Sequence, residues 1–101
     1  MHVVAGKRLT RQLAQSADGA GCRVRFIGEA SKPWSAAMFM GGLHEVTIAI
    51  DGENAQRWID GLDEDAIRLP GFVLSTLEVT AAVTVNDQLT ATIEAETVQE
   101  A

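Results

Sequence analysis

Cysteine and aromatic residues are scarce in this chain. The single cysteine, Cys22, excludes an internal disulfide and leaves no second thiol for a redox pair or a cysteine-rich metal site. Tyrosine is absent, and the 101 residues include three phenylalanines and two tryptophans. The chain therefore offers few rings on which nucleic-acid bases could stack, a contact that binding to single strands commonly uses.

Long apolar runs and an excess of positive charge are also lacking. The longest apolar stretch, residues 36–43, is far too short to span a membrane, and no apolar signal-peptide core follows Met1. The net charge of −6 disfavours general nucleic-acid binding, which depends on Lys and Arg neutralising phosphates. We therefore expect a cytoplasmic protein that contacts no membrane, with nucleic acid disfavoured as a partner.

The charges are unevenly distributed along the chain. Residues 1–32 contain six basic and two acidic residues, whereas residues 33–101 contain two basic and twelve acidic ones. Folding could interleave these charges on a solvated surface. Alternatively, a basic patch could orient an acidic partner or the acidic part of a second copy. The residues expected in that patch are Arg8, Arg11, Arg23 and Arg25.

Hydrophobic periodicity predicts helices and strands throughout the chain. Apolar residues recur every four positions over residues 5–17 and at helical spacing over residues 55–66, which predicts two amphipathic helices. Alternation at a period of two predicts strands over residues 22–29, 43–50, 73–85 and 89–95. Residues 31–33 should end the first of these strands, since Pro33 cannot donate to a ladder.

Two turns set the register of the predicted hairpins. If Gly41-Gly42 forms a two-residue turn, residues 34–40 make a further strand that pairs with residues 43–50. For the last hairpin, a three-residue loop of residues 86–88 keeps the apolar residues opposite one another, whereas a two-residue loop sets Val83 opposite Thr90. We expect the three-residue loop.

These elements predict a single α+β domain over residues 1–101. Their order is α-β-β-β-α-β-β, which favours a two-layer sandwich with a mostly antiparallel five-stranded sheet and both helices on one face. The order, small size and acidity resemble the general build of dimeric bacterial secretion chaperones, although the extra C-terminal helix usual in those proteins is missing here. This resemblance concerns the fold alone and implies a binding protein.

An exposed apolar patch is expected on the sheet face that the helices leave uncovered. With the turn at Gly41-Gly42, four residues share that face, and such contiguous clusters commonly mark interfaces. They are Trp34, Met38, Met40 and Leu43. Two alternatives remain: the parity could be shifted by one residue, or the Trp34 side chain could fold over an edge into the core.

Catalytic and metal-binding motifs are not recognisable in the sequence. His44 lies on the apolar parity of its strand, where a hydrogen-bonded core histidine is more common than a base, and Glu45 points to the opposite face. The acidic residues 60–65 lack the spacing of a calcium loop. We therefore expect no enzyme activity, no metal and no cofactor.

The sequence thus predicts a small protein-interaction module that associates with a protein partner or with itself, most simply as a homodimer. One alternative is a small-ligand or enzymatic site in a pocket near His44 and Trp58. A second alternative is nucleic-acid binding through the N-terminal arginines.

Overall fold

The computed structural model describes residues 2–100 and contains two helices and four strands in that range. The elements, in chain order, are α1 (His2–Gly19), β1 (Arg23–Ala36), β2 (Phe39–Asp51), α2 (Ala55–Asp60), β3 (Phe72–Val85) and β4 (Gln88–Gln99). The strands form one sheet in the order β1-β2-β4-β3, and every neighbouring pair is antiparallel.

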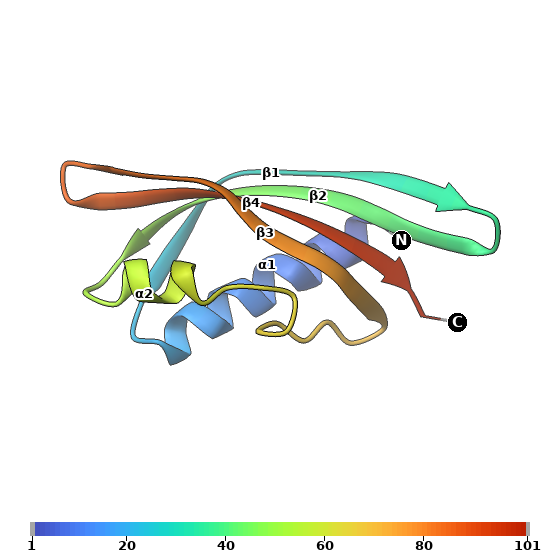
Figure 1. Cartoon of the computed structure of the whole chain (residues 1–101), viewed down its shortest axis with the longest axis horizontal. Coiled ribbons are helices and arrows are strands. Elements are labelled where there is room, and N and C mark those ends of the chain that lie inside the picture. The colour runs from blue at the N-terminus through green and yellow to red at the C-terminus, as the bar shows by residue number, and fades with distance from the viewer. Residues whose placement is uncertain (1, 101) are drawn as a thin grey trace.

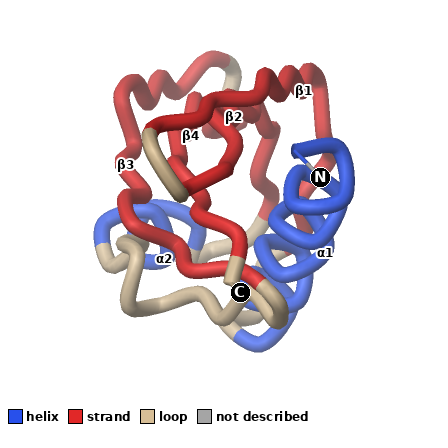
Figure 2. The backbone as a smooth tube through the Cα atoms, turned by 90° about the vertical axis from the view of Figure 1, so that its right-hand side faces the viewer, coloured by secondary structure: helices blue, strands red, loops and turns tan. Residues whose placement is uncertain are grey.

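Both helices lie on the same side of the sheet and leave its other side uncovered (Figure 1). Seen along the long axis of the molecule, α1 lies towards β1 and α2 towards β3 (Figure 2). The sheet is longer than the helical layer, so the β1-β2 hairpin projects at one end and the β3-β4 hairpin at the other (Figure 1). The molecule is accordingly elongated, with extents of 46 × 21 × 18 Å.

The core lies between the helices and one face of the sheet. The predicted helix over residues 5–17 is confirmed, because α1 buries Ala5, Leu9, Leu13 and Ala17, which the four-residue repeat places on one side. The central strands supply the opposite wall from alternate positions. Its fully buried apolar members are Ile48 and Ile50 on β2 and Ala91 and Ile93 on β4.

The expectation of five strands is wrong because β1 does not end at residues 31–33. It continues through Pro33 to Ala36, and the turn falls at Ala37-Met38 instead of Gly41-Gly42. β1 is an edge strand, where proline is tolerated because one side of the strand has no ladder to complete. Ala37 adopts a φ of 52°, so an alanine supplies the left-handed conformation expected of the glycines.

The predicted loop of the last hairpin is also wrong. Asn86 and Asp87 form a two-residue turn with positive φ values of 52° and 64°, a conformation that asparagine and aspartate tolerate well. The register shifts at Thr80, which bulges out of β3 and moves every later residue of the strand to the other face. As a result, Val83 and Val85 are exposed.

The second helix is shorter than predicted and ends at Asp60. Gly61 follows it, and the side chain of Asp63 accepts hydrogen bonds from the backbone N–H groups of Asp65 and Ala66. These local bonds give the backbone an alternative to helix geometry. The observed order α-β-β-α-β-β therefore differs from the one on which the resemblance to secretion chaperones rested.

Candidate functional site

The uncovered side of the sheet, called the open face below, has no helix over it. Residues directly paired across neighbouring strands share a face, so the register assigns side chains to it in rows. One row, called the apolar row, consists of Trp34, Gly41, Val98 and Val73. Phe39, with 58% of its surface exposed, and Leu43 flank that row on β2.

The structure divides the four predicted interface residues between different surfaces. Trp34 and Leu43 lie on the open face, whereas Met40 follows the parity of the core-facing residues of β2 and Met38 occupies the tip of the hairpin. Met38 is 91% exposed, and Met40 is exposed as well. The expectation that all four share one face is wrong, because it depended on a turn at Gly41-Gly42.

Gly41 explains where the Trp34 side chain goes. A Cβ atom at Gly41 would lie 2.7 Å from Cε2 and Nε1 of Trp34 and would collide with the Thr97 carbonyl oxygen. The indole therefore lies over Gly41, which makes Trp34 half-buried. Its Nε1–H is buried and has no hydrogen-bond partner among residues 2–100. Such an unpaired donor costs free energy unless a partner supplies an acceptor.

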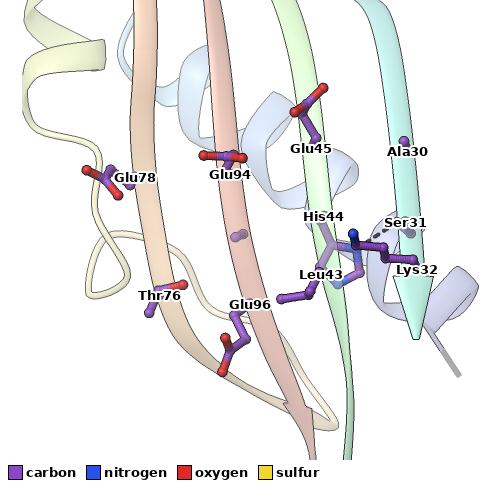
Figure 3. Close-up of a pocket in the computed structure, with 11 residues that line it drawn as sticks. Ala30, Ser31, Lys32, Leu43, His44, Glu45, Thr76, Glu78, Glu94 and Glu96 are labelled. Carbon is purple, nitrogen blue, oxygen red and sulfur yellow. Dashed lines mark hydrogen bonds between the residues drawn. The ribbon is translucent and has the colours of Figure 1, made fainter. Parts of the chain in front are cut away.

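A row of three glutamates crosses the centre of the open face. Glu94 on β4 is paired with Glu45 on one side and Glu78 on the other, and the three side chains lie side by side (Figure 3). Together with Glu96 and Lys32 they line a hollow of about 520 Å³. Like charges directly opposite in a sheet are destabilising. A positive charge placed over this glutamate row would therefore reduce the repulsion between the three carboxylates.

The two free edges of the sheet are poorly suited to pairing with another strand. β1 has a bulge at Ile27 and a proline at position 33, and β3 has bulges at Ser75 and Thr80. Bulges and prolines on edge strands are common devices against edge-to-edge association. Pairing of a further strand at either edge is therefore disfavoured.

The His44 side chain is buried in the core, although the residue also borders the hollow that the glutamates line. Its side chain is 97% buried: Nδ1 lies 2.7 Å from the Ser31 hydroxyl and Nε2 lies 2.9 Å from the Thr97 hydroxyl. Thr97 can donate to the Gly42 carbonyl at 3.5 Å, which suits a neutral imidazole that donates from Nε2 and accepts at Nδ1. Burial, with a smaller contribution from His2, lowers the pKa of His44.

The proposed pocket residues His44 and Trp58 are not brought together. The Trp58 indole donates to the Ser16 hydroxyl of α1 at 2.9 Å, whereas His44 lies beside Gly6 near the other end of that helix. Ten residues of helix separate these contact points by about 15 Å. The two side chains therefore line no common pocket.

The four arginines predicted as a basic patch come from two elements, α1 and β1. Arg23 and Arg25 share the open-face parity of β1, and Arg8 and Arg11 lie on α1. Arg8 donates to the Pro70 carbonyl at 2.6 Å, and its guanidinium lies 5.6 Å from the Phe72 ring centroid. Arg8 thus holds the loop before β3, whereas Arg11 and Arg23 line one shallow hollow between α1 and β1.

The glutamate row was not predicted from the sequence. The alternation of β4 shows that Glu94 and Glu96 share a face, but the adjacency of Glu45 and Glu78 depends on the strand order β1-β2-β4-β3. Strand order is a long-range property that periodicity does not contain. A prediction would have required knowing that β4 inserts between β2 and β3.

Among residues 2–100, no three His, Cys, Asp or Glu side chains are grouped so that they could hold a metal ion. The same range includes no helix with the length and apolar character needed to cross a bilayer. No known protein-family model matches the chain, and no curated protein sequence is detectably similar to it.

Proposed function

We propose that this chain is a small, non-catalytic protein-interaction module of the cytoplasm that self-associates through its open face. The observation that carries the proposal is the combination of an uncovered four-stranded face with exposed apolar side chains gathered at one end of it. Phe39, Leu43 and Val73 are the exposed members of that cluster, and Trp34 and Val98 lie half-buried beside them. Contiguous exposed apolar clusters of this kind are common at interfaces, where aromatic residues are enriched.

Two further observations support contact through the face. The bulges and Pro33 disfavour pairing at the edges of the sheet, which leaves the face as the available surface. The buried Nε1–H of Trp34 has no acceptor among residues 2–100, and a partner could provide one. A site at His44 has weaker support, because both ring nitrogens already have hydroxyl partners.

Removing apolar area from the open face should weaken self-association. In the variant Phe39→Thr, Leu43→Thr, two exposed apolar side chains are replaced by a residue that favours strands, so the fold should be retained. We expect the solution mass, measured by sedimentation velocity over a concentration series, to stay near 10.8 kDa for the variant and to rise for the native chain.

A matched control uses the other side of the same hairpin. Met38→Thr, Met40→Thr removes two exposed apolar side chains from the tip and from the face turned towards the helices. We expect this variant to associate as the native chain does. If the methionine variant loses association and the Phe39 and Leu43 variant keeps it, the open face is not the contact surface.

A further inference from the structure

The glutamate row indicates what the open face contacts. Glu45, Glu94 and Glu78 repel one another, and their register neighbours within the row are each other and Ala30, not a basic residue. A partner that places positive charge over this row would relieve the repulsion. Such a partner also needs apolar side chains for the apolar row, which lies about 13 Å away, four strand residues along β4.

The outer side of α1 has this combination of side chains. The side of α1 opposite its buried residues is exposed. From the N-terminal end, it carries Val3, Val4, Lys7 and Arg11. Val4, Lys7 and Arg11 are spaced by three and four residues, so they form one stripe, which we call the helix stripe. Neither Lys7 nor Arg11 has a side-chain hydrogen bond to another described residue, in contrast to Arg8.

The spacing of the two surfaces matches. Along α1, Val4 and Arg11 are about 10 Å apart, close to the distance of about 13 Å between Val98 and Glu94 on β4. With Val4 over the apolar row, Lys7 falls near Glu96 and Arg11 over the glutamate row.

We propose that the helix stripe of one copy docks on the open face of the next copy. This inference rests on the proposed function and names the surface that the open face recognises. α1 and the open face lie on opposite sides of the molecule (Figure 1), so they cannot meet within one chain. The contact is heterologous: each copy uses a different surface towards each neighbour, which generates a ring or an open stack instead of a closed two-fold dimer.

A face-to-face dimer would not satisfy the charges in the same way. Stacking two open faces centre on centre would place one glutamate row over the other and gather six carboxylates in the contact. Like charges brought together in this way disfavour association. The helix stripe avoids this repulsion by presenting Lys7 and Arg11 to the same row.

Charge reversal on each surface tests the inference. The helix variant is Lys7→Glu, Arg11→Glu, and the sheet variant is Glu45→Arg, Glu94→Arg. Each variant alone has two surfaces of like charge, so we expect each to remain at the monomer mass of 10.8 kDa in sedimentation velocity. An equimolar mixture again contains complementary surfaces, and we expect its mass to rise to at least twice that value at low salt.

Matched controls and the possible outcomes separate this inference from the proposed function. Arg57→Glu, Arg68→Glu changes the net charge as much as the helix variant does, at exposed residues outside the contact, and should associate as the native chain does. If the sheet variant is monomeric but the helix variant still associates, docking by α1 is wrong while the open face remains the interface. If the native chain associates and the sheet variant does so equally, or if the native chain stays monomeric, the proposed function fails as well. Circular dichroism would establish that each variant is folded.

Discussion

Replacing His44 by leucine should lower the free energy of unfolding at pH 8 by about 1–3 kcal/mol, the usual cost of leaving buried hydrogen-bonding groups without partners. Leucine preserves much of the volume of the imidazole but cannot pair with the hydroxyl groups of Ser31 and Thr97. Thr97 is completely buried, so water cannot replace the lost bond. Urea unfolding followed by circular dichroism measures the change.

The same substitution should remove part of the pH dependence of stability. Burial lowers the pKa of His44 below 6.5, so the folded state excludes a proton that the unfolded chain accepts. The contribution of His44 to the free energy of unfolding is therefore fully present above pH 6.5. It declines as the pH falls below 6.5 towards the pKa of His44 in the folded state. We expect the difference in stability between the native chain and the leucine variant to shrink over this pH range.

A double variant separates the effect of losing the His44–Thr97 hydrogen bond from the effect of altered packing. His44→Leu, Thr97→Val replaces both partners by apolar groups, which costs less than leaving one partner unpaired, so part of the lost stability should return. If the single and double variants are equally unstable and the pH dependence is unchanged, His44 does not have the role assigned to it.

Substituting Gly41 by alanine should destabilise the protein by about 1–3 kcal/mol, as overpacking commonly does. The added Cβ would collide with the Thr97 carbonyl and with the Trp34 indole, and the carbonyl belongs to the backbone of the neighbouring strand, which cannot move freely. The indole can move away, which would expose it to water. We therefore expect lower stability together with a red shift of the tryptophan fluorescence.

Gly28 provides a matched control on the same face of the sheet. No heavy atom lies within 4 Å of a Cβ at this position, so Gly28→Ala introduces no clash. Replacing a strand glycine by alanine should instead be neutral or stabilise by up to about 1 kcal/mol. Equal stability of the two alanine variants would contradict the close approach of Trp34 and Thr97 to Gly41.

The helices and most of the strands could be predicted because they depend on local periodicity. The four-residue repeat of α1 and the alternation of β2 follow directly from which side chains face the core. The turns were harder, because glycine serves two purposes. Gly41 and Gly42 look like a hairpin turn, but they are strand residues whose missing side chains make room for the rings of Trp34 and His44.

The candidate site was predicted less completely than the fold. Trp34 and Leu43 were correctly expected on the uncovered face, because both lie there in the structure. Met38 and Met40 were misplaced by the same error in the turn that added a fifth strand. The bulge at Thr80, which exposes Val83 and Val85, has no signal in a regular alternation of apolar residues.

Methyl NMR spectra recorded over a dilution series would test most directly whether the open face is the surface of self-association. The account predicts that the methyl signals of Leu43, Val73 and Val98 move with protein concentration, whereas those of Val83 and Val85, at the other end of the sheet, stay in place. Signals that are independent of concentration at all five residues, or that move only at Val83 and Val85, would contradict it.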